Sequence, residues 1–197
     1  MSRTQLKPVI FGIYNNDLEN ITPDSSVKLC FQPLDFIAHW NRCSVTADFL
    51  SGFQNIAFTS KNSEKYFNIL STVINELLEN SIKFSFDKTE PVFLQLNKYS
   101  DVLTAEAYNI TASDGANNLN VLAKKIKTEY NLEDLYQQKL MRIKNTDFDI
   151  SGLGLIMLLK DLHAELGIKI LPKTDTSEPL YDIFIKILLR KEALDLL

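Results

Sequence analysis

The sequence predicts a two-layer α/β sandwich, in which a mixed and mostly antiparallel sheet is covered by helices on one face. Two observations favour a single domain: the chain has 197 residues, and 45% of them are apolar. The third observation is the order of the periodic segments, β, α, α, ββ, α, α, α, ββ, which is typical of an antiparallel sheet with helices gathered on one side. We therefore expect one domain over residues 1–197.

In the first half of the chain, the pattern of apolar and polar residues is weak at the start and becomes clearly periodic further on. Residues 1–26 are weakly patterned. Residues 27–32 alternate apolar and polar side chains, which indicates a strand that Pro33 ends. Helices are expected at residues 35–41, 46–58 and 63–84. Ser63 is a suitable N-cap for the last of these helices.

The second half predicts a hairpin, three helices and a closing pair of strands. Residues 92–97 and 102–110 show period-two alternation on either side of a short polar link, as in a hairpin. Helices are expected at residues 119–128, 132–143 and 153–165. Gly167 is a suitable stop for the last of them. Strands at residues 168–171 and 180–189 close the chain.

Charge and composition exclude several classes of protein. The formal net charge is -4, so the chain lacks the positive charge that grips a nucleic-acid backbone. No run approaches the roughly 18 consecutive apolar residues of a membrane-spanning helix, and the N-terminus has no signal-peptide core. The two cysteines, Cys30 and Cys43, form no C-x-x-C pair. We expect a reduced, cytoplasmic protein that binds neither nucleic acid nor membrane.

One pair of residues suggests a metal site. His39 and Cys43 stand four residues apart, so they could share a helix face and hold a metal ion. Only Cys30 and His163 remain as further soft ligands. Ordinary core and surface positions are therefore the favoured interpretation.

A polar stripe borders the apolar face of the helix expected at residues 63–84. Five apolar residues at helical spacing predict its buried face: Leu70, Val73, Ile74, Leu77 and Leu78. Glu76, Asn80 and Lys83 border that face, while Asn75 and Glu79 point elsewhere. Polar groups at the edge of a core are costly to desolvate without a ligand or partner. The alternative is an ordinary amphipathic helix whose border residues are solvated or form a Glu–Lys salt link.

The second feature is a glycine turn that leads directly into an apolar helix. Residues 149–155 read Asp-Ile-Ser-Gly-Leu-Gly-Leu. Gly152 and Gly154 let the backbone approach a ligand closely, and the N–H groups at the start of the following helix suit phosphate groups. Glycines before helices are also common in ordinary turns, which is the alternative. The segment is neither a Walker loop nor a Rossmann fingerprint, because no G-K-[ST] follows and no strand immediately precedes it.

Taken together, the two features resemble a known pair of motifs. In this order and spacing, E-L-L-E-N-S-I-K-F-S (76–85) and S-G-L-G-L-I-M-L (151–158) resemble the N box and the second glycine box of the Bergerat-fold (GHKL) ATPases. That superfamily includes histidine kinases, gyrase, Hsp90-type ATPases and the kinases that act as anti-sigma factors. The resemblance covers residues 63–189 and implies a histidine-kinase-like ATPase domain that binds ATP or ADP with Mg²⁺.

The resemblance also implies a role for each matching residue. Asn80 stands where the family's asparagine coordinates Mg²⁺, and Glu76 stands where the family has its general base. Lys83 stands where a basic residue often meets the phosphates. The remaining phosphate contacts would come from the glycine box, at Ser151, Gly152, Leu153, Gly154 and Leu155.

The first glycine box of the family, in which an Asp-x-Gly-x-Gly aspartate accepts a hydrogen bond from the adenine amino group, is missing. At the matching point the chain offers Asn109, whose amide oxygen is a weaker acceptor than a carboxylate. Asp114 and Gly115, several residues further on, are a second candidate. Loss of one charge-assisted hydrogen bond costs roughly 1–3 kcal/mol of binding free energy, and the choice between ATP and ADP stays open.

A bacterial group of small stand-alone Bergerat proteins is similar in further respects. That group also lacks the first glycine box and carries an N-terminal extension, here residues 1–62. Residues 39–50 resemble its Trp-containing helix start, although Trp40 also suits plain core packing, and residues 133–140 resemble its helix before the glycine box.

The resemblance implies an ATP- or ADP-binding protein of partner-switching signalling. It would act as a serine/threonine protein kinase on a small anti-anti-sigma (STAS-like) partner and have weak ATPase activity. One alternative is a non-catalytic, nucleotide-gated module that sequesters its partner as an anti-sigma factor does. Another is an α/β domain in which both motifs arose by chance. Whether the chain forms a homodimer stays open.

Overall fold

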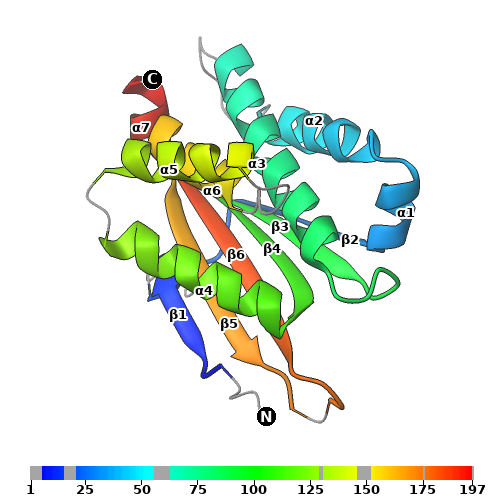
Figure 1. Ribbon diagram of the computed structural model, residues 1–197. Coiled ribbons are helices and arrows are strands. Elements are labelled where there is room, and N and C mark those ends of the chain that lie inside the picture. Colours follow the sequence, from blue (N-terminus) through cyan, green and yellow to red (C-terminus); the bar gives the residue numbers. More distant parts are fainter. Residues whose placement is uncertain are drawn as a thin grey trace.

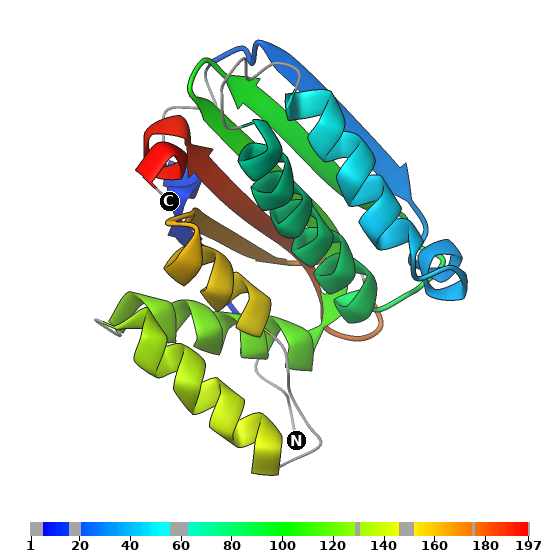
Figure 2. The ribbon, with the colours of Figure 1, turned by 90° about the horizontal axis from the view of Figure 1, so that it is seen from above.

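The computed structural model describes residues 6–15, 21–55, 63–128, 131–145, 152–174 and 176–196. These residues form an α/β sandwich in which one sheet lies behind a layer of helices (Figures 1 and 2). The sheet has six strands: β1 (Val9–Gly12), β2 (Ser25–Phe31), β3 (Val92–Tyr99), β4 (Val102–Ala112), β5 (Glu165–Pro172) and β6 (Leu180–Arg190). The predicted fold class is confirmed.

The strand order is β1-β5-β6-β4-β3-β2, and every neighbouring pair is antiparallel. The sheet is therefore antiparallel throughout rather than mixed. Its two edge strands, β1 and β2, come from the N-terminal part of the chain. Residues that we expected to pack on the domain as an extension thus supply both edges of its sheet.

The helices lie on one side of this sheet (Figure 2). Their bounds are α1 (Pro33–Ala38), α2 (Arg42–Asn55), α3 (Ser63–Phe84), α4 (Ser113–Thr128), α5 (Leu132–Asn145), α6 (Leu153–Asp161) and α7 (Lys191–Leu196). A 3-10 turn, η1 (Ile13–Asn15), follows β1. The amphipathic helix α3 contacts β4 on one side and α2 on another, so it forms the centre of the core. All five residues predicted for its apolar face are buried.

Several elements differ from the sequence-based expectation, among them α4, which begins at Ser113 rather than at residue 119. The helix expected over residues 153–165 ends at Asp161, because His163 takes a positive φ of 49° that a right-handed helix cannot continue. Gly167 is therefore not a helix stop; it lies within β5 opposite Lys186, close to the Tyr14 ring. The strand β1 and the helix α7 were not predicted, because four and six residues are too few to show a clear periodic pattern.

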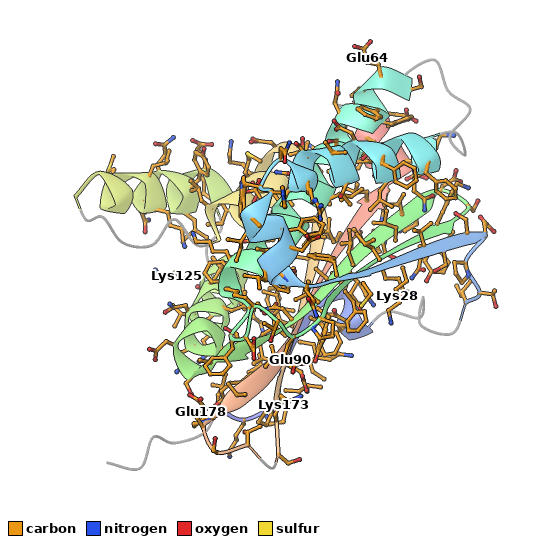
Figure 3. All side chains as sticks on the ribbon, turned by 90° about the vertical axis from the view of Figure 1, so that its right-hand side faces the viewer. Lys28, Glu64, Glu90, Lys125, Lys173 and Glu178 are labelled. Atoms are coloured by element: carbon orange, nitrogen blue, oxygen red, sulfur yellow. The ribbon has the colours of Figure 1, made fainter. Side chains whose placement is uncertain are left out.

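The face of the sheet opposite the helices is covered by its own long side chains. Phe93, Tyr108 and Phe184 lie beside one another on β3, β4 and β6, with ring centroids 5.6 and 4.9 Å apart. The Lys28 ammonium lies 4.5 Å from the Phe93 ring centroid, and Figure 3 labels this lysine. The Tyr108 hydroxyl donates to Asp182 at 2.8 Å. Burial and this carboxylate raise the pKa of Tyr108.

No helix in the described ranges combines the length and the apolar character needed to cross a bilayer.

The position of α3 generates a stability prediction. Leu77 is fully buried between α3 and its neighbours, so Leu77→Ala should lower the free energy of unfolding by about 2–5 kcal/mol through lost burial and a residual cavity. Val121→Ala, at a half-exposed site on α4, should change it by less than about 1 kcal/mol. Urea denaturation of both variants measures the difference, and equal effects would contradict the central place of α3 in the core.

Candidate functional site

The helices α3 and α6 lie close to each other (Figures 1 and 2). Glu76 of α3 faces the start of α6. A Cβ atom placed on Gly154 would overlap Oε2 of Glu76 and would lie 2.8 Å from Oε1. The Glu76 carboxylate therefore lies directly against the Gly154 backbone, and only a residue without a side chain leaves room for it. The two sequence motifs, far apart along the chain, thus adjoin in space.

Glu76 is partly buried at this contact. Burial raises the pKa of its carboxyl above the ordinary value of 4.5, and the nearby charge of Glu79 raises it further. A hydrogen bond from the Asn80 side chain acts in the opposite direction. The balance leaves Glu76 a stronger base than a solvated glutamate.

Asn80 lies one turn after Glu76 and binds to it. Its Nδ2 donates to the backbone carbonyl oxygen of Glu76 at 2.7 Å, and its side chain also hydrogen-bonds the Glu76 carboxylate. The amide nitrogen of Asn80 is therefore already hydrogen-bonded to Glu76. The amide oxygen is the atom of this side chain with the ligand chemistry that Mg²⁺ prefers.

The other polar residues of α3 point in the directions that the helical spacing predicts. Asn75 Nδ2 donates to Glu79 Oε1 at 2.7 Å, so these two side chains pair with each other. Cys43 of α2 is buried, and burial raises the pKa of its thiol to about 11, with a further contribution from the negative charge of Glu79. Lys83 is exposed, and its ammonium lies 5.2 Å from the Phe84 ring centroid.

Gly152 begins α6 and has the left-handed backbone conformation, with φ of 77°. Leu122 of α4 fills the place where its side chain would lie, with Cγ 3.5 Å from an added Cβ atom. No sequence signal pointed to Leu122 as a support of this turn. Both the conformation and the close contact therefore require glycine at position 152.

Of the remaining residues of the glycine box, one is buried in the core and two lie at the candidate site. The side chain of Leu155 is buried and anchors α6, whereas Leu153 and Gly154 are half-buried. The first N–H groups of an α-helix have no partner within the helix, so the start of α6 presents donors beside the Glu76 carboxylate. Ser151 lies outside the described residues.

Asn109 lies on β4, on the face of the sheet that the helices cover. Its side chain is only 5% exposed, and its Nδ2 has no hydrogen-bond partner in the described part of the chain. A buried amide without a partner costs about 1–3 kcal/mol, so such a group calls for a ligand or an ordered water. The segment just after α3 binds the neighbouring residue of β4, since Phe86 N–H donates to the Ile110 carbonyl at 2.7 Å.

The structure contradicts the shared helix face expected for His39 and Cys43, and it places Asp114 and Gly115 in a helix rather than a loop. Asp114 and Gly115 lie in the first turn of α4, with Gly115 packed on Thr111, so they do not form a glycine-box loop. His39 is the C-cap residue of α1 and Cys43 lies in α2, so the two do not share a helix face. In the ranges that the structure describes, no three His, Cys, Asp or Glu side chains gather as a metal site would require.

Comparison with known proteins identified no match. No protein-family model matches the chain, and no curated protein matches it. Any functional assignment therefore depends on the residues of the site.

The pKa of Glu76 predicts a pH-dependent stability difference. Folding raises the pKa of Glu76, so the folded state favours the protonated carboxyl group. Protonated Glu76 therefore contributes its full stability below about pH 4.5, and this contribution is lost as the pH rises through the folded-state pKa. Glu76→Gln should therefore melt at a higher temperature than the unmodified chain at pH 7, with a difference that shrinks toward pH 4.5. Thermal melts across this pH range measure it.

Glu133 provides a control of opposite sign. Hydrogen bonds from Gln137 and Lys160 lower the pKa of Glu133, so its contribution is present at neutral pH and is lost as pH falls. Glu133→Gln should accordingly be less stable than the unmodified chain at pH 7. A Glu76→Gln effect that does not vary with pH would contradict the assigned environment.

The contact between Glu76 and Gly154 predicts a coupling between two substitutions. Gly154→Ala alone should destabilise the fold by about 1–3 kcal/mol, because the new methyl group overlaps the carboxylate. In a Glu76→Ala background the same change should be neutral or stabilising, since alanine favours helix over glycine. A double-mutant cycle by urea denaturation measures the coupling, and additive effects would show that the two residues do not touch.

Proposed function

We propose that this chain is a cytoplasmic protein that binds Mg·ATP or Mg·ADP at the junction of α3 and α6, and that it acts as a serine/threonine kinase on a small STAS-like partner. The observation that carries the proposal is the contact of Glu76 with Gly154. It joins the acidic residue of the segment that resembles an N box to the glycine turn that resembles a phosphate-binding box.

The residues at this junction fit the proposed nucleotide. The start of α6 offers backbone N–H donors to phosphate groups, and the left-handed turn at Gly152 leads directly into these donors. The Asn80 amide oxygen suits a magnesium ion that relies on phosphates and water for its other ligands. Lys83, one turn further along α3, adds positive charge near the phosphates.

Asn109 fits the base end of the same ligand. Its Nδ2 is buried and has no hydrogen-bond partner among the described residues. Asn109 directly precedes Ile110, whose carbonyl accepts a hydrogen bond from Phe86 just after α3. A nucleotide base presents donors and acceptors on its edge, so it would supply the partner that the amide lacks.

Bound Mg·ATP would supply the phosphoryl group that is transferred and the charge neutralisation that transfer requires. The chain's contribution is the positioning of a base and of an acceptor hydroxyl. Glu76 accepts the proton of the partner's serine or threonine hydroxyl, for which its raised pKa suits it. Asn80 holds the Glu76 carboxylate in place through the hydrogen bond between their side chains.

The second candidate is a nucleotide-gated module that sequesters its partner without catalysis. The neutral Asn109 favours this function, because weaker recognition of the base suits a switch that releases its ligand. Both candidates require nucleotide binding, and they differ only in the role of Glu76.

Isothermal titration with Mg·ATP and Mg·ADP tests nucleotide binding. Asn80→Ala should weaken binding at least about tenfold, or about 1.4 kcal/mol, whereas Asn68→Ala on an exposed part of α3 should leave it unchanged. No binding at millimolar ATP would contradict both candidate functions.

Transfer of a labelled γ-phosphoryl group to a co-purifying partner separates the two candidates. For a kinase, Glu76→Gln should retain nucleotide binding and lose about 10²–10⁴-fold in transfer rate. Glu64→Gln, in the exposed first turn of α3, is the matched control. Nucleotide binding and partner capture without any phosphorylated protein would favour the sequestering module.

A further inference from the structure

The unpartnered amide of Asn109 lies among uncharged neighbours. Ala107 and Thr111 are the adjacent residues on the same face of β4, and Ile183 of β6 lies directly opposite Asn109 in the register of the sheet. All three of these neighbours are buried. No charged side chain therefore adjoins Asn109 along its own strand or across to β6.

The acidic side chains of the neighbouring elements do not replace this amide. Asp114 is exposed in the first turn of α4, and Glu106 of β4 is ion-paired with Lys186 at 2.9 Å on the other face of the sheet. The Glu76 carboxylate lies against Gly154 at the glycine turn. In the described ranges, each fully buried polar side chain is an amide or a hydroxyl, among them those of Ser81 of α3, Thr111 of β4 and Asn120 of α4. The described groups that are buried and free of charge are thus the ones left to read a base.

A carboxylate and an amide recognise the edge of a purine differently. A carboxylate only accepts hydrogen bonds, so it binds the 6-amino group of adenine and repels the 6-carbonyl oxygen of guanine or hypoxanthine. The amide of Asn109 carries a donor on Nδ2 and an acceptor on Oδ1, and a half-turn about its Cβ–Cγ bond exchanges their positions.

Each orientation of the amide matches one kind of purine. In one, Oδ1 accepts from the amino group of adenine while Nδ2 donates to a ring nitrogen. In the other, Nδ2 donates to the carbonyl oxygen of a 6-oxopurine while Oδ1 accepts from the neighbouring ring N–H. Both pairings give the buried Nδ2 of Asn109 an acceptor, and both consist of hydrogen bonds between neutral groups.

We propose that the site binds 6-oxopurine nucleotides, those of guanine and hypoxanthine, about as tightly as adenine nucleotides, and that Asn109 is the residue that permits both. This inference rests on the proposed function, since it concerns the base of the nucleotide at the junction of α3 and α6. The ligand class is a magnesium-bound purine diphosphate or triphosphate. The phosphates and the metal ion are common to all members of this class, so selectivity depends on what the base meets.

Isothermal titration of the unmodified full chain with Mg·ADP and with Mg·IDP (inosine diphosphate) tests the proposal. The two ligands share their sugar and phosphates and differ at the 6-position of the base. Their dissociation constants should lie within about tenfold of each other. Binding of Mg·ADP more than about tenfold tighter than Mg·IDP would overturn the proposal and leave the proposed function intact. No binding of either ligand at millimolar concentration would overturn the proposed function, and this inference with it.

Asn109→Asp gives a second measurement, because it replaces the amide by a carboxylate of the same shape. Relative to Mg·ADP, Mg·IDP should bind this variant at least about tenfold more weakly than it binds the unmodified chain, since a carbonyl oxygen would then face a negative charge. Asn118→Asp adds the same charge at an exposed position of α4 and should leave the ratio of the two affinities unchanged.

A ratio that stays the same in Asn109→Asp would also overturn the proposal. Circular dichroism shows whether this variant folds. The comparison of the two ligands on the unmodified chain does not require the variant, so it decides the question even where a buried carboxylate prevents folding.

Discussion

The contact between the Glu76 carboxylate and the backbone of Gly154 constrains the arrangement of α3 and α6. It fixes how closely the start of α6 approaches α3, and any side chain at position 154 would separate them. It also removes water from one side of an ionisable group, which raises its pKa. One packing contact therefore determines both the geometry and the chemistry of the candidate site.

The same helix serves the core and the candidate site. One side of α3 is buried by apolar residues, and its border carries Glu76 and Asn80. Because α3 is held by β4 and α2, its border residues have little freedom to move. On β4, the Nδ2 of Asn109 has no hydrogen-bond partner among the described residues, so it marks a buried polar position that those residues do not satisfy.

Much of this arrangement could be predicted from the sequence, because period-two and period-3.6 patterns depend on local residue order. The bounds of α3 and the burial of its apolar face follow from such patterns. The end of α6 at Asp161 could not be predicted, since residues compatible with a helix continue to Glu165 and the break depends on the backbone of His163. The contacts of Gly152 with Leu122 and of Gly154 with Glu76 depend on how distant segments pack, which the spacing of residues does not specify.

The central claim is that α3, β4 and the start of α6 form a single ligand site, and nuclear magnetic resonance tests it most directly. Titration of ¹⁵N-labelled protein with Mg·ADP should shift the backbone amides of Gly152 and Gly154 and the side-chain amides of Asn80 and Asn109 together, with one common affinity. Shifts confined to other parts of the chain, or separate affinities for the two glycines and the two asparagines, would contradict the claim.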